Sequence, residues 1–164
     1  MTLAINKAKL LKAIQAQLHD ELSTAINASK TAHESATHSE NIAENKYDTL
    51  GLEAAYLAHG QSLRIEELNI LIEQLSNFHC PDFIKHSAIQ AGALVTLLDD
   101  NDCQRLFFIS PSTGAMSLEF QGQSLQVVSI NAPLGKMLNN KHCGDEITLT
   151  INNRSHSYEV MAVE

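Results

Sequence analysis

The sequence contains no tryptophan, and aromatic residues make up only 5% of its 164 positions. Large aromatic side chains bury more apolar area than other residues and dominate thick globular cores. Hydrophobic residues nevertheless amount to 44% of the chain, which is enough for a packed interior. We therefore expect slender packing, rich in Ala and Leu, in place of one thick core.

Cysteine and long apolar runs are also scarce. Cys80, Cys103 and Cys143 form no close pair, and an odd number at wide spacing argues against a disulfide framework or a zinc ribbon. No stretch approaches the roughly 18–20 apolar residues that span a bilayer. The first residues lack the unbroken apolar segment of a signal peptide. These absences predict a soluble, cytoplasmic protein with reduced thiols and no membrane segment.

Basic residues are outnumbered throughout the chain. The formal net charge is −8, and residues 1–78 hold six Lys and Arg against ten Asp and Glu, while residues 79–164 hold five against nine. Non-specific affinity for nucleic acid comes mainly from Lys and Arg that neutralise phosphates. The sequence therefore argues against independent DNA binding, and it is compatible with a basic protein partner or with metal ions.

Proline is absent from residues 2–73, where the only glycines are Gly51 and Gly60. Apolar residues in this part recur at helical spacing in two arms of roughly thirty residues, which is typical of paired helices. We expect residues 1–78 to form a long antiparallel helical hairpin. The expected contact positions are Leu11, Ile14, Leu18, Leu22, Ala25, Ala28 and Ala32 in the first arm, and Leu50, Ala54, Leu57, Gln61, Ile65, Leu68, Ile72 and Leu75 in the second.

The helical pattern stops after residue 78. Residues 79–90 contain Pro81 and no clear periodicity, which predicts a linker. Residues 91–164 show short β-like runs separated by turn residues. The expected strands are 93–99, 105–110, 118–120, 125–130, 146–151 and 157–163, with a short helix over 132–141. By the order of its elements, this is a small antiparallel β domain with one helix, and the whole chain is of the α+β class.

The segment 38–48, HSENIAENKYD, lies between the two predicted helices and is strongly acidic. Loops between helices are often polar, and a carboxylate near a helix start favours the helix dipole, so the composition alone requires no function. A long hairpin that ends in carboxylates is also suited to carrying charge into a narrow place. Carboxylates a few residues apart are ligands that Mg²⁺ accepts.

The order of parts and two stretches of sequence resemble the Gre family of bacterial transcript-cleavage factors, in a divergent branch. VSINAPLGKMLNNKHCGDEITLTI followed by SYEVMAVE is similar to the C-terminal signature of that family. ENKYDTLGLEAAYLAHGQSLRIEEL resembles its second hairpin helix, and GALVTLLDD resembles the first strand of its C-terminal domain.

The resemblance implies an FKBP-like C-terminal domain over 91–164 that docks on the rim of the secondary channel of RNA polymerase. We expect the docking residues to be Pro133, Leu134, Gly135 and Leu138. The hairpin would then reach the polymerase active centre, and its tip would meet the 3′ end of the nascent RNA. The factor itself would be no enzyme and would hold no cofactor of its own. It would assist the Mg²⁺-dependent RNA cleavage of the polymerase in the bacterial cytoplasm.

At the tip, the resemblance places the acidic residues of the family on Glu44 and Asn41. Asn41 is an amide where the family carries Asp, and Glu40 next to it could substitute. The expected assisting residues are therefore Glu44, Glu40 and Asn41, with Glu40 and Glu44 holding a second Mg²⁺ shared with the polymerase.

Three hypotheses remain open at this stage. In the first, the chain is a Gre-like factor that either stimulates transcript cleavage or regulates initiation or pausing without cleavage. In the second, from a different class, the chain is a coiled-coil and FKBP-like protein-interaction module, which predicts exposed apolar residues on the hairpin flanks. A small-molecule enzyme is the third alternative, although the sequence has no nucleophile-elbow or phosphate-binding glycine motif.

Overall fold

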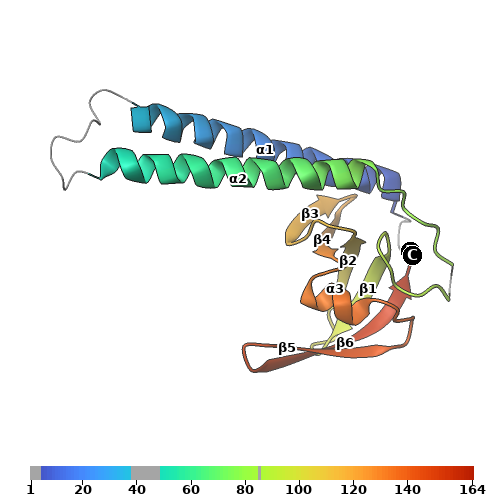
Figure 1. Ribbon diagram of the computed structural model, residues 1–164. Helices are drawn as coiled ribbons and strands as arrows, with labels where there is room; N and C mark the ends of the chain where they lie inside the picture. The colour runs from blue at the N-terminus through green and yellow to red at the C-terminus, as the bar shows by residue number, and fades with distance from the viewer. Residues whose placement is uncertain (1–4, 38–48, 85) are drawn as a thin grey trace. The chain divides into compact units, whose positions relative to one another are not determined.

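Two long helices make up the first part of the chain. The computed structural model describes residues 5–37, 49–84 and 86–164. Helix α1 spans Lys7–Thr37 and helix α2 spans Leu50–Ser76, and the two lie side by side (Figure 1). They form the predicted helical hairpin.

Six strands and a short helix make up the rest. Helix α3 spans Pro133–Leu138, inside the predicted range 132–141. The strands are β1 (Leu94–Asp99), β2 (Gln104–Ser110), β3 (Met116–Phe120), β4 (Gln123–Ser129), β5 (Glu146–Ile151) and β6 (Arg154–Val163). The predicted α+β class, with a helical hairpin followed by a small β domain and one short helix, is confirmed.

The chain divides into two compact units. One unit comprises Ala13–Glu73, and the other comprises Met1–Lys12 together with Gln74–Glu164. The predicted limits of the linker, 79–90, stay a prediction. Within that range Ile89 is fully buried, its amide donates to the carbonyl of Lys141, and its own carbonyl accepts from the amide of Asn140.

The hairpin unit has a narrow interior. Its buried side chains are Ile14, Leu18, Ala25 and Ala32 of α1 and Leu68 of α2. An ion pair joins the two helices, because Arg64 Nη2 lies 2.9 Å from Glu21 Oε2. One predicted contact position is wrong: Leu57 is 58% exposed.

The sheet has the strand order β3-β4-β2-β1-β6-β5. Four of its five pairings are antiparallel, but β2 and β4 are parallel, with Ser110 opposite Ser129. The sequence prediction had only antiparallel pairs. The parallel pair arises because β3 pairs with β4 at the edge of the sheet, which brings β4 back along β2 in the same direction.

Two tight turns set the register of the outer hairpins. Asn152 and Asn153 both have positive φ, at 50° and 62°, between β5 and β6. Between β3 and β4, Gln121 and Gly122 also have positive φ, at 51° and 76°. Two successive residues with positive φ match the twist of antiparallel strands, and Asn and Gly adopt them most readily. Both turns fall in segments that the sequence predicted as turns.

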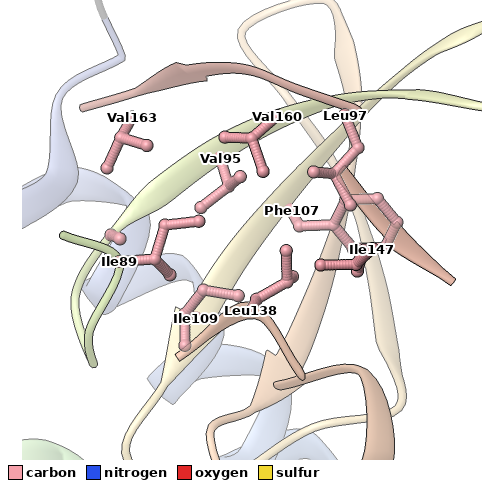
Figure 2. Close-up of a cluster of buried hydrophobic side chains, with 10 residues drawn as sticks. Ile89, Val95, Leu97, Phe107, Ile109, Leu138, Ile147, Val160 and Val163 are labelled. Atoms are coloured by element: carbon pink, nitrogen blue, oxygen red, sulfur yellow. The ribbon is translucent and has the colours of Figure 1, made fainter. Parts of the chain in front are cut away.

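One cluster of buried side chains lies between α3 and the sheet. Figure 2 shows Leu138 of α3 among side chains of four strands, including Phe107 of β2 and Ile147 of β5. Leu134 and Met137 of α3 pack against the cluster and are partly buried. The complete cluster is Ile89, Ala93, Val95, Leu97, Phe107, Ile109, Leu138, Ile147, Val160 and Val163.

Candidate functional site

The predicted tip residues Glu40, Asn41 and Glu44 lie outside the described residues. The structure defines the two helix ends on either side of them. At the end of α1, the Thr37 hydroxyl donates to the carbonyl of His33 over 2.9 Å. At the start of α2, the Thr49 hydroxyl donates to Glu53 Oε1 over 3.0 Å, which holds a carboxylate in the first helical turn. The assisting and metal-binding roles of the tip residues stay predictions.

Helix α3 carries the four residues predicted to dock on a partner. It begins at Pro133, whose fixed φ suits the first helical position, and Ala132 precedes it in an extended conformation. Pro133 is exposed and Leu134 is half-buried, whereas Gly135 and Leu138 are buried. Of the four, only the first two present surface to a partner in this conformation. The docking roles themselves stay predictions.

Gly135 is where α3 comes closest to strand β4. A Cβ at this position would collide with the Ser129 carbonyl oxygen and would lie 2.9 Å from both Ile130 Cα and Ser129 C. Gly114 is in a similar position, since a Cβ there would lie 2.6 Å from the Ser129 amide nitrogen. Two glycine-containing segments therefore pack against the end of β4. This close contact fixes where α3 presents Pro133.

The turn after β1 is a hydrogen-bonded polar site, where the sequence predicted only a turn. Asp99 Oδ2 accepts from Arg105 Nε over 2.8 Å, and Oδ1 accepts from the amides of Asn101 and Cys103. The hydrogen bond from Arg105 is the largest of the effects that hold the pKa of Asp99 below its ordinary value. Neighbouring Asp100 accepts from the Ser157 amide over 2.9 Å, which connects this turn to β6.

The surface beside this turn is acidic. A shallow hollow there has a volume of about 250 Å³ and is lined partly by Asp99, Asp100, Asp102, Glu146 and Glu159. Across the described ranges, however, no group of three or more His, Cys, Asp or Glu side chains has an arrangement that could hold a metal ion. Such a surface is complementary in charge to cationic groups.

A larger cleft of about 940 Å³ involves the start of α1 and the segment after α2. Lys7 Nζ lies 4.1 Å from the centre of the Phe83 ring, and burial lowers the pKa of Lys7. The Cys80 thiol donates to the carbonyl of Gly92 over 3.2 Å, and burial raises the pKa of this thiol. A raised pKa leaves little thiolate, so Cys80 is a poor nucleophile.

The fold defines a class: a long helical hairpin followed by a small β domain with one short helix. Among the described helices, none has the length and apolar character required to cross a membrane. Residues 84–164 match the family described as "Transcription elongation factor, GreA/GreB, C-term". Through these residues the chain contains a GreA/GreB C-terminal domain, as its sequence resemblance predicted.

Three solved structures show similarity over much of the chain. The GreA factor homolog 1 (Gfh1) of Thermus thermophilus is 20% identical, with 95% of this chain and 93% of that chain covered and a TM-score of 0.38. Gfh1 of Thermus aquaticus is 23% identical, with coverage of 95% and 92% and a TM-score of 0.38. A GreA/GreB factor of Nitrosomonas europaea is 16% identical, with coverage of 68% and 91% and a TM-score of 0.37. Among the curated proteins, none matches the chain.

Proposed function

We propose that the protein is an accessory factor of RNA polymerase that modulates transcription elongation. The observation that carries this proposal is the match of residues 84–164 to the C-terminal domain of GreA/GreB elongation factors. In the proposal, the β domain docks at the rim of the secondary channel, with Pro133 and Leu134 in the contact. The hairpin then brings segment 38–48 to the polymerase active centre. The charge of −8 supports a cationic protein surface as the partner and not free nucleic acid.

The chemistry at the tip would be the recruitment of a second Mg²⁺ to the polymerase. Glu40 and Glu44 offer carboxylate oxygens and Asn41 offers an amide oxygen, and oxygen ligands are the type that Mg²⁺ prefers. Two cations stabilise the attacking and leaving oxygens together better than one does. An amide brings no charge, so Asn41 weakens this site relative to a carboxylate. The proposal therefore includes two versions, one that stimulates cleavage of backtracked transcripts and one that regulates without cleavage.

Co-migration with core RNA polymerase tests the binding step. The purified protein is expected to co-migrate with the polymerase in native gels, in an assay where a Gre factor does so. Absence of co-migration under those conditions would refute the proposed function.

RNA release from stalled, backtracked complexes then separates the two versions. If the protein stimulates cleavage, Glu44→Gln is expected to abolish release of short 3′ fragments while leaving binding intact, and Asn41→Asp to increase release. Glu34→Gln is the matched control, because Glu34 is an exposed carboxylate of α1 that lies before the tip segment. No release by the wild-type protein at any Mg²⁺ concentration would favour the non-cleaving version, and a gain of release in Asn41→Asp would identify the amide as the cause.

One observation favours the protein-interaction alternative. Exposed apolar residues on the hairpin flank are what that alternative predicts, and the described part of α2 has five of them: Leu52, Tyr56, Leu57, Leu63 and Ile70. The two functions differ in one measurable respect, since a pure interaction module would be insensitive to Glu44→Gln and Asn41→Asp.

A further inference from the structure

Helix α2 exposes a row of large apolar side chains on its outer face. Leu52, Tyr56, Leu63 and Ile70 are 56%, 69%, 51% and 48% exposed. At about 100° per residue in an α-helix, these four positions fall within an arc of roughly 40°. We call them the outer stripe. A fifth exposed apolar residue of α2, Leu57 at 58%, lies about 120° away around the helix and is not part of it.

The outer stripe is not part of the hairpin interior. Leu68, the buried residue of α2 in this unit, lies on the opposite side of the helix, at about 140° from the middle of the stripe by the same helical geometry. A surface helix normally has one apolar stripe, which faces its core, and polar residues on the other face. Single exposed apolar residues are common and need no explanation, whereas four aligned ones mark an interaction surface.

Helix α1 provides a comparison within the same unit. Its only large apolar side chain with comparable exposure among the described residues is Ile26, at 48%. The outer stripe is therefore a property of α2 and not of the hairpin in general.

The charges around the outer stripe are acidic. Helix α2 contains four Glu and one Arg, so its formal charge is +1 − 4 = −3. Glu66 and Glu73 flank the stripe on one side and Glu67 on the other. Arg64 is already engaged, since it lies 2.9 Å from Glu21 and 3.2 Å from Glu67. Two copies of this chain that paired through their outer stripes would bring Glu residues together, which disfavours self-association.

We infer that the outer stripe is a docking surface for a helix of a partner protein with apolar residues at helical spacing and Lys or Arg beside them. Tyr56, Leu63 and Ile70 are seven residues apart, the repeat with which two helices pack along their length. From Leu52 to Ile70 the stripe extends about 27 Å, at 1.5 Å per residue. The inference rests on the proposed function in one respect: the partner that carries this helix is RNA polymerase.

The contact would supply affinity independently of the tip. Aromatic and large aliphatic anchors contribute most of the energy in helix-in-groove contacts, and flanking charges select the partner. Glu66 and Glu73 would then contribute through their charge, so their effect should diminish as the salt concentration rises.

The test is equilibrium binding of the full chain to core RNA polymerase, measured by fluorescence anisotropy of a labelled protein. Ile70→Ser and Leu63→Ser together are expected to weaken binding at least tenfold. Ile26→Ser is the matched control, because Ile26 and Ile70 are equally exposed at 48%, and it is expected to leave binding unchanged. Glu66→Gln with Glu73→Gln is expected to weaken binding at low salt and to reduce its salt dependence. Circular dichroism and thermal melting confirm that each variant is folded.

The outcomes separate this inference from the proposed function. If the wild-type protein binds polymerase and the Leu63→Ser, Ile70→Ser variant binds equally well, the docking surface is refuted while the proposed function stands. If the wild-type protein does not bind, the proposed function and the assigned partner are both wrong. Sedimentation equilibrium of the wild-type chain provides the last check. A dimer that Ile70→Ser dissociates would show that a second copy occupies the stripe, and would overturn the inference.

Discussion

The sharpest stability prediction compares one substitution, Gly to Ala, at two helical positions. Gly60 lies in α2, and a Cβ there would meet nothing within 4 Å. Gly135 lies in α3, where a Cβ would collide with the Ser129 carbonyl oxygen and lie 2.9 Å from two further backbone atoms. The added methyl group is the same, and only the surroundings differ.

The two effects on stability have opposite signs. Ala is preferred over Gly in a helix interior by about 1 kcal/mol, so Gly60→Ala should raise the free energy of unfolding by that amount. At Gly135 the same preference is outweighed, because overpacking a tight site costs about 1–3 kcal/mol. The upper end of that range applies, since the atoms in the way belong to the backbone of β4 and its following turn and cannot rotate aside. The net loss is then about 2 kcal/mol, equivalent to a fall in Tm of roughly 8–16 °C for a domain of this size.

Chemical unfolding followed by circular dichroism at 222 nm measures both variants. Hydrogen exchange assigns the change, because Gly135→Ala should accelerate exchange of amides in β2 and β4, and Gly60→Ala should slow exchange in α2. If Gly135→Ala proved as stable as the wild-type protein, the close contact between α3 and the end of β4 would be wrong, and with it the position assigned to Pro133.

Three further predictions concern other parts of the fold. Leu68→Ala should lower the free energy of unfolding by about 2–5 kcal/mol because Leu68 is fully buried. Leu63→Ala should change the free energy of unfolding by less than about 0.5 kcal/mol because Leu63 is exposed. Urea titration measures both variants. Cys80 should react with iodoacetamide at least tenfold more slowly than the exposed Cys103 and Cys143 in the native protein, since burial raises the pKa of its thiol. Peptide mass spectrometry measures the three rates, and equal rates would contradict the prediction. Asp99→Asn should destabilise the protein at pH 7, because the pKa of Asp99 is held below its ordinary value mainly by Arg105. That contribution is present above the unfolded-state pKa of about 3.9 and is lost as the pH falls through the lower folded-state pKa, so the urea midpoints of variant and wild type should converge in strong acid.

The strands were predictable because their signals are local. The run 146–151 was predicted with the same bounds that β5 has, and its alternation of Thr with buried Ile147 and Leu149 shows the pattern of a strand with one covered face. Strand pairing is not local. Nothing within β2 or β4 distinguishes a parallel neighbour from an antiparallel one, and the parallel pair follows from where β3 lies in the sheet.

The predicted contact face of α2 has the right phase, but one of its positions is exposed. By helical geometry Leu57 lies about 20° from buried Leu68, so the periodicity assigned it to the interior, yet it is 58% exposed. Because the periodicity follows the interior face, it gave no sign of the outer stripe on the other side of the helix. A search for apolar residues seven apart would have found Tyr56, Leu63 and Ile70.

The predicted docking residues illustrate a second limit. Pro, Leu and Gly in a short helix suit a docking surface and a packed interior equally well, and only the fold separates exposed Pro133 from buried Gly135 and Leu138. For the tip, the sequence supplies residue types and a family position, and the described residues end at Thr37 and resume at Thr49.

The position of β6 has a consequence for how the protein is made. Strand β6 lies between β1 and β5, and it pairs with β1 across about sixty residues of chain. During synthesis, the strands β1 to β4 therefore emerge while β1 still has one unpaired edge, and such edges attract other chains. The pairing of β1 with β6 cannot be completed until residue 163 has left the ribosome. The hairpin unit, Ala13–Glu73, can fold well before that moment, so it should acquire structure before the unit that contains the sheet.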